Sequence, residues 1–138
     1  MDWSVNWWAV LVAGLIYFVL GWVWFSPVLF AKPWMAELKI SPAHMNEDAR
    51  KRMPFLMAGA LLTGLLLAWV LALLVHRLHL ETIASAIRLS LALGVIVLAA
   101  PMANSYAFSG RSLKLYLIDL GMPVVGIVVM TVLLVAWP

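Results

Sequence analysis

Four long apolar stretches follow one another along the chain, with polar residues gathered between them. The first contains no charged residue from Val5 to about Ser26. The others cover residues 54–75, 83–102 and 113–137. About 20 helical residues cross the roughly 30 Å hydrocarbon core of a bilayer. The pattern therefore predicts a single transmembrane domain over residues 1–138, an all-α integral membrane four-helix bundle.

The main polar segment, KISPAHMNEDARKRM, lies in the loop at about residues 32–53, between the first two spans. Ser41 followed by Pro42 is typical of a helix start, and Glu47 and Lys51 have the i,i+4 spacing of a helical ion pair. We therefore expect a short surface helix in this loop, at the level of the lipid headgroups.

The stretch WVWFSPVLFAKPW, residues 22–34, ends the first span with a concentration of aromatic residues. Pro27 has no amide hydrogen and is a natural place for a helix to bend or stop. Trp24 and Trp34 are of the type that favours the headgroup level. Two interpretations remain open: an aromatic belt at the exit of the span, or part of a binding site.

Composition supports a membrane protein and narrows its chemistry. Hydrophobic residues make up 66% of the 138 residues and charged residues only 11%, with a mean hydropathy of +1.06. Soluble domains carry about 25% charged residues. The net charge of +3 is concentrated in two loops, so we interpret it as a topology signal and not as a nucleic-acid surface. Cysteine is absent, which excludes disulfides and thiol catalysis.

The distribution of lysine and arginine predicts the orientation. Most of these residues lie in the first and third loops, namely Lys32, Lys39, Arg50, Lys51, Arg52, Arg111 and Lys114. By the positive-inside rule these loops are cytoplasmic, and both termini lie on the non-cytoplasmic side. Trp7 and Trp137 would then anchor the outer interface, and Trp24 and Trp34 the inner one.

Small residues recur at every fourth position in two of the spans, which gives each helix a flat face for close packing. They are Ala60, Gly64, Ala68 and Ala72 in the second span, and Ala86, Ser90 and Gly94 in the third. The spacing predicts helix-packing faces. It leaves open whether these faces meet within one chain or between chains.

Asp119 is a carboxylate about two turns inside the fourth span. An ionised carboxylate at the centre of a spanning helix costs about 2.5 to 3.5 kcal/mol, so this side chain needs a partner or a proton. Pro123 cannot donate to the Asp119 carbonyl, which places a carboxyl group beside a free backbone acceptor. Two roles remain open: a structural ion pair or hydrogen-bond anchor, and a transport or proton-relay site.

Other chemistry has little support in the sequence. His76 and His79 have the i,i+3 spacing at which two imidazoles can share a metal, but no acid or third histidine of firm placement accompanies them. We find no serine with a nearby histidine–acid pair and no glycine-rich phosphate loop. We therefore expect no metal site and no enzymatic activity.

Two segments, GWVWFSPVLFAKPWMAEL and NSYAFSGRSLKLYLIDLG, resemble the signature regions of the domain of unknown function 1761 family, small bacterial membrane proteins with four predicted helices. The matching positions are Gly21, Trp24, Phe25, Ser26, Pro27, Phe30 and Trp34 in the first segment, with Phe25 in place of tyrosine, and Asn104, Phe108, Gly110, Arg111, Leu113, Asp119 and Gly121 in the second. Met122 and Pro123 stand where relatives often have a histidine. The resemblance implies the fold and the bacterial cytoplasmic (inner) membrane, but no activity.

Both segments fall at the predicted inner ends of the spans. We therefore hypothesise that they converge on one polar site in the inner leaflet, built from Ser26, Lys32, Asn104, Arg111 and Asp119.

The sequence predicts an accessory or structural subunit that acts by helix packing with its own copies or with a larger membrane complex. The alternative is a small oligomeric transporter or channel with its polar centre at Asp119 and Asn104. The expected partners are the lipid bilayer and other membrane subunits, without nucleic acid. The sequence indicates no particular cofactor, and contact of the tryptophan faces with a lipid or pigment stays open.

Overall fold

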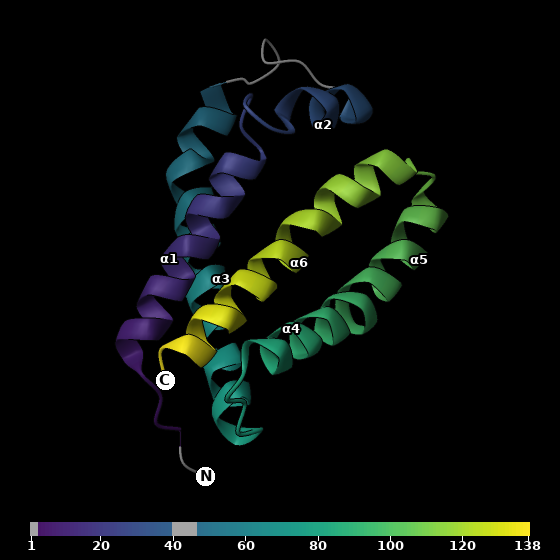
Figure 1. Ribbon diagram of the computed structural model, residues 1–138. Coiled ribbons are helices and arrows are strands. Elements are labelled where there is room, and N and C mark those ends of the chain that lie inside the picture. Colours follow the sequence, from purple (N-terminus) through teal and green to yellow (C-terminus); the bar gives the residue numbers. More distant parts are fainter. Residues whose placement is uncertain (1–2, 40–46) are drawn as a thin grey trace.

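The structure, a computed structural model, describes residues 3–39 and 47–138, and every described element is helical. The elements in chain order are α1 (Trp7–Trp24), α2 (Ala31–Leu38), α3 (Glu47–Arg77), α4 (Ile83–Ala92), the π-helix η2 (Leu93–Ala99), α5 (Ala100–Ser109) and α6 (Leu113–Ala136). Figure 1 shows α4, η2 and α5 running on from one another beside α6.

Four of these helical segments are long and apolar enough to cross a membrane. They are Trp7–Trp24, Lys51–Arg77, Ile83–Ser109 and Leu113–Ala136. The prediction of an all-α membrane bundle is thereby confirmed. The third segment continues to Ser109, beyond the predicted end near residue 102.

The loop predicted at residues 32–53 contains α2 and the first turns of α3. The predicted helix start at Ser41 and Pro42 lies outside the described residues. The helix that begins at Glu47 continues through Pro54 into the second span, so it is the membrane helix itself and not a separate surface helix. The described part of this loop also contains the short helix α2, which comes before the polar segment.

Side-chain caps fix where α1, α4 and α6 begin. Asn6 caps α1 by accepting a hydrogen bond from the Ala9 amide at 3.2 Å. Thr82 and Ser85 form a reciprocal capping box at the start of α4, and Ser112 caps α6 by accepting from the Leu115 amide at 3.1 Å. Such caps satisfy amides that have no intrahelical partner.

The π-helix η2 was not expected from the sequence. Pro101 follows it and has no N–H to donate to the carbonyl four residues earlier, so the normal α-helical ladder is interrupted there. The Ala100 amide bonds instead to the Val95 carbonyl, five residues back. The helix axis continues, and Gly94 approaches α6 so closely that a Cβ there would lie 3.1 Å from Val124 Cγ2.

The bundle has two different ends. The terminal end holds both chain termini and the turn between α3 and α4, and the loop end holds α2 and the turn between α5 and α6 (Figure 1). The Asn6 side chain donates a hydrogen bond to the Pro138 backbone oxygen at 3.1 Å, which joins the beginning of α1 to the C-terminus. The beginning of α1 and the C-terminus therefore lie at the same end of the bundle.

The apolar core belongs mainly to the terminal end. Its buried members come from α1, α3, α4 and α6 and include Ala13, Leu71, Ala86, Met130 and Leu134. Of the predicted packing faces, Gly64, Ala68, Ala72, Ala86, Ser90 and Gly94 are buried, whereas Ala60 is exposed. A Cβ at Gly64 would lie 2.9 Å from the Gly14 backbone oxygen on α1. The buried small residues therefore serve contacts within one chain.

Candidate functional site

Asp119 lies at the meeting point of three elements at the loop end. The indole Nε1 of Trp34, on α2, donates to Asp119 Oδ1 at 2.9 Å. The hydroxyl of Tyr106, on α5, donates to Asp119 Oδ2. Each carboxylate oxygen therefore has one side-chain donor, and each donor comes from a different helix.

A second hydrogen bond ties α2 to the start of α6. The Ser112 hydroxyl donates to Glu37 Oε2 at 2.6 Å while its oxygen accepts from the Leu115 amide. Ser112 thus caps α6 and binds α2 at the same time. Because Asp119 lies two turns after this cap, the Glu37 and Trp34 contacts hold α2 against two successive levels of α6.

Trp24 makes the corresponding contact from the end of α1. Its indole Nε1 donates to the Ile118 carbonyl at 3.0 Å. The ring lies against Gly121, where an added Cβ would be 2.7 Å from Trp24 Cζ2. Gly121 therefore permits the close approach, which would be lost with any larger residue.

Aromatic contacts extend the site along α5. The guanidinium carbon of Arg111 lies 5.2 Å from the centre of the Tyr106 ring, a cation–π distance. Tyr106 and Tyr116 meet edge to face with ring centres 5.5 Å apart. The Tyr116 hydroxyl donates to the Ala99 carbonyl at 2.7 Å, at the end of the π-helix. Tyr106 therefore connects Arg111 with Asp119.

The structure brings together only part of the hypothesised site. Asp119 and Arg111 both contact Tyr106. Ser26 makes a local hydrogen bond, donating to the Val23 carbonyl at 2.6 Å. Lys32 and Asn104 are exposed, and no hydrogen bond joins them to Asp119. The site is thus a carboxylate with aromatic donors instead of a cluster of all five residues.

Sequence reasoning did not identify Tyr106 or the role of Trp34. Tyr106 was visible only as part of the motif that follows Asn104, and Trp34 was interpreted as an interface anchor. Trp7 and Trp137, at the terminal end, are 62% and 43% exposed, as lipid-facing or interfacial side chains would be. Trp24 and Trp34 are only partly exposed and direct their N–H groups into the protein.

Physically, this arrangement holds a carboxylate in place. In the described part of the chain Asp119 makes no ion pair, so its hydrogen bonds carry the stabilisation. Hydrogen bonds to a charged acceptor are stronger than neutral ones, and each is worth about 1.5 to 3 kcal/mol. The geometry favours an anchor that joins α2, α5 and α6, because both oxygens are already engaged.

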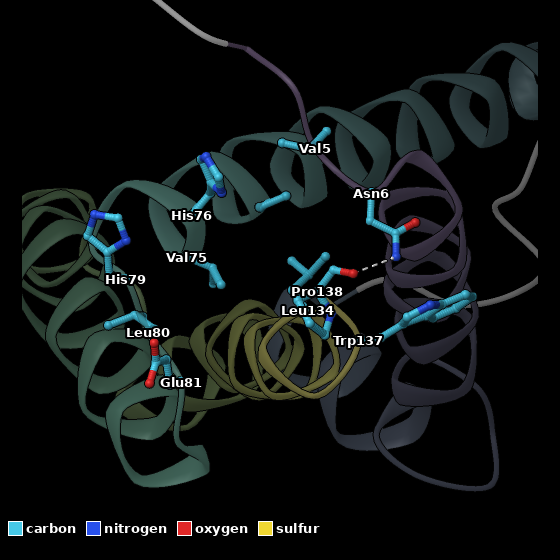
Figure 2. A pocket seen from close by; sticks show the side chains of 11 residues that line it. Val5, Asn6, Val75, His76, His79, Leu80, Glu81, Leu134, Trp137 and Pro138 are labelled. Carbon is cyan, nitrogen blue, oxygen red and sulfur yellow. Dashed lines mark hydrogen bonds between the residues drawn. The ribbon is translucent and has the colours of Figure 1, made fainter.

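A cavity of about 180 Å³ lies at the terminal end (Figure 2). His76, His79 and Glu81 line it together with apolar residues and the C-terminal Pro138. Both histidines are exposed, and His79 adopts a left-handed backbone with φ 50°. Among residues 3–39 and 47–138, no group of three histidine, aspartate or glutamate side chains could hold a metal ion.

One family model matches almost the whole chain, from residue 8 to residue 135: "Protein of unknown function (DUF1761)". Searches of curated proteins and of solved structures gave no significant match. The two segments of the sequence that resemble the family contact each other in the fold. Trp24 packs against Gly121, and Trp34 donates to Asp119.

Proposed function

The chain belongs to the DUF1761 family of proteins of unknown function, and from that premise we propose that it is a non-enzymatic membrane protein acting as an accessory or structural subunit. It would act through helix packing, either with its own copies or with a larger membrane complex. The observation that carries the proposal is an exposed polar face on α5, a helix at the end of a membrane span.

The α5 face combines polar and aromatic groups that the described part of the chain leaves uncovered. Asn104 and Ser105 are exposed, and Phe108 is 90% exposed. The span that contains α5, Ile83–Ser109, is the least buried of the four. Amide and hydroxyl side chains in spanning helices characteristically hydrogen-bond across to another helix. A neighbouring subunit would supply such a partner.

The Asp119 contacts support a structural role over transport. One donor occupies each carboxylate oxygen, the indole N–H of Trp34 and the hydroxyl of Tyr106. A transport or relay site would need a carboxylate that is open to an ion or to water. We therefore favour the anchor, and the transport alternative has no separate observation in its favour.

We further propose that the protein lies in the bacterial cytoplasmic membrane with both termini on the non-cytoplasmic side. The hydrogen bond between Asn6 and Pro138 supports a common side for the termini. The excess of lysine and arginine around α2, the start of α3 and the α5–α6 turn favours the cytoplasm for the loop end.

Mild-detergent purification of the tagged full-length protein, followed by native mass spectrometry, tests the subunit proposal. We expect either a stoichiometric unrelated membrane protein or a homo-oligomer of defined size. The first result would identify an accessory subunit, and the second a self-assembling structural protein. A monomer without any stoichiometric protein partner would refute the proposal.

A pair of matched variants assigns the contact to α5. Ala107 lies one turn from Asn104 on α5, and Ala58 lies on α3; both are exposed in spanning helices. Ala107→Trp should disrupt the complex, because the larger ring would obstruct a packed partner. Ala58→Trp should leave it intact. Equal retention of the partner by both variants would exclude the α5 face as the contact.

A further inference from the structure

A large cavity lies at the loop end, separate from the α5 face. Its volume is about 760 Å³, within the range of small-molecule sites. It lies between α1, α2, α3 and α6 and is open on one side, and its wall is formed mainly by aromatic rings and methionines. Representative lining residues are Tyr17, Trp22, Phe25, Trp34, Met57 and Met122.

The lining restricts what the cavity can accept. Among the residues that the structure describes, no charged side chain lines it, and methionine side chains adapt their shape to an apolar partner. Ser26 is one of its few polar residues, and its hydroxyl already donates to the Val23 carbonyl. The part of a ligand that enters the cavity is therefore uncharged and largely apolar.

The cavity is accessible from the side of the protein that faces lipid. Trp22 is 69% exposed, and Ala60 is exposed as well; both belong to spanning helices and line the cavity. Pro27 and Trp34 line it at the loop end of the bundle. A molecule that already resides in the bilayer can enter laterally with its polar end at the membrane surface.

Positive charge lies at the same end of the bundle as this opening, on α2 and in the first turns of α3. Lys32 comes two residues before Trp34 on α2, and Lys51 and Arg52 directly precede Met53, which also lines the cavity. All three cations are exposed. Basic pockets next to spanning helices recognise the headgroups of anionic lipids. We call Lys32, Lys51 and Arg52 the basic edge.

We propose that the cavity holds an acyl chain of one anionic phospholipid whose phosphate lies at the basic edge. The apolar wall recognises the chain, and the cations recognise the headgroup. Because Trp34 both lines the cavity and donates to Asp119, the bound chain packs against the residue that anchors α2. The lipid therefore stabilises the loop end and does not depend on a protein partner at α5.

Native mass spectrometry of the full-length protein with added lipid tests this proposal. The probes are phosphatidylglycerol and phosphatidylcholine with identical acyl chains. We expect one tightly retained phosphatidylglycerol per chain and weaker retention of phosphatidylcholine. Lys32→Gln or Lys51→Gln should each reduce the preference about fivefold, the effect of one cation near a membrane surface. Lys114→Gln, the same charge change at the α5–α6 turn, should leave the preference unchanged.

Filling the cavity tests the acyl-chain contact separately. Ala60→Phe should abolish retention of both lipids, whereas Ala58→Phe, an exposed residue that does not line the cavity, should retain them. Circular dichroism and size-exclusion profiles equal to those of the wild type establish that both variants fold. Undiminished retention in folded Ala60→Phe would overturn the proposal, as would equal retention of the two lipids by the wild type.

Discussion

The terminal end and the loop end are held together by different forces. At the terminal end, α1, α3 and α6 approach closely over small residues, and the core is apolar. At the loop end, side chains of Trp24, Trp34 and Ser112 make hydrogen bonds that join α1 and α2 to α6. The large cavity lies at this second end.

This difference follows from the membrane environment. Lipid tails are as apolar as leucine, so burying an apolar side chain between helices gains little. Close van der Waals packing and interhelical hydrogen bonds are the forces that remain. The terminal end uses mainly the first and the loop end mainly the second. The hydrogen bonds at the loop end can therefore be weakened while the packed terminal end stays intact.

The largest effect is expected where two backbones touch. Gly64→Leu places a Cβ 2.9 Å from the Gly14 carbonyl oxygen, and backbone cannot move aside as a flexible side chain can. We expect the free energy of unfolding in mixed micelles to fall by about 3 kcal/mol. Helical circular dichroism during detergent-induced unfolding measures it.

Gly59→Leu is the control for this substitution. Gly59 lies on the same helix, and a Cβ there would meet nothing within 4 Å. The control should be at least as stable as the wild type, because it removes a helix-destabilising glycine without creating a clash. Equal losses in the two variants would show that glycine flexibility, and not close packing, matters at the terminal end.

Asp119→Asn is expected to have the next largest effect, confined to the loop end. An asparagine amide can accept through only one of its two terminal atoms, so either Trp34 or Tyr106 loses its acceptor. We expect a loss of about 2 kcal/mol. Hydrogen exchange should accelerate in α2 and α5 and remain unchanged at Ala13 and Leu71 in the terminal core. Uniform acceleration throughout the bundle would contradict the separation of the two ends.

The spans were predictable because the length and hydropathy of a membrane helix can be recognised from the sequence alone. Apolar stretches of about 20 residues with few or no charges locate them, and the i,i+4 repetition of small residues identified faces that include Gly64 and Ala86. The π-helix was not found, because Pro101 alone does not reveal how the backbone compensates for its missing amide. Periodicity also could not tell that Ala60 would line a cavity instead of a packed interface.

The candidate site was less predictable because its contacts cross large distances in sequence. Asp119 stood out as an isolated carboxylate in an apolar span, but its donors, Trp34 and Tyr106, belong to types that also populate membrane interfaces. An indole N–H is equally suited to a headgroup and to a carboxylate. Only the arrangement of α2 beside α6 decides between the two partners.

Ser112→Ala and Thr82→Ala compare the two ends through the loss of one helix cap each. The expected loss of stability is smaller than for Asp119→Asn. Each removes a helix-capping side chain, Ser112 at the loop end and Thr82 at the terminal end. Loss of a cap costs about 1 kcal/mol. Ser112→Ala should cost more in unfolding free energy, because it also removes the bond to Glu37. In a Glu37→Ala background, which has no side-chain acceptor for Ser112, the two losses should become more similar, and an unchanged difference would exclude Glu37 as its source.

Tyr116→Phe has the smallest expected effect. It tests whether the hydrogen-bonded contacts around Asp119 extend to the π-helix. The substitution removes one hydroxyl, which donates to the Ala99 carbonyl at 2.7 Å, and keeps the ring that packs against Tyr106. Interhelical hydrogen bonds in membranes average about 0.6 kcal/mol, and we expect a loss of that size. Hydrogen exchange should accelerate in η2 and the start of α5 but not in α2. Acceleration in α2 as well would mean that the Tyr116 and Asp119 contacts form one cooperative unit, so that the loop end opens as a whole.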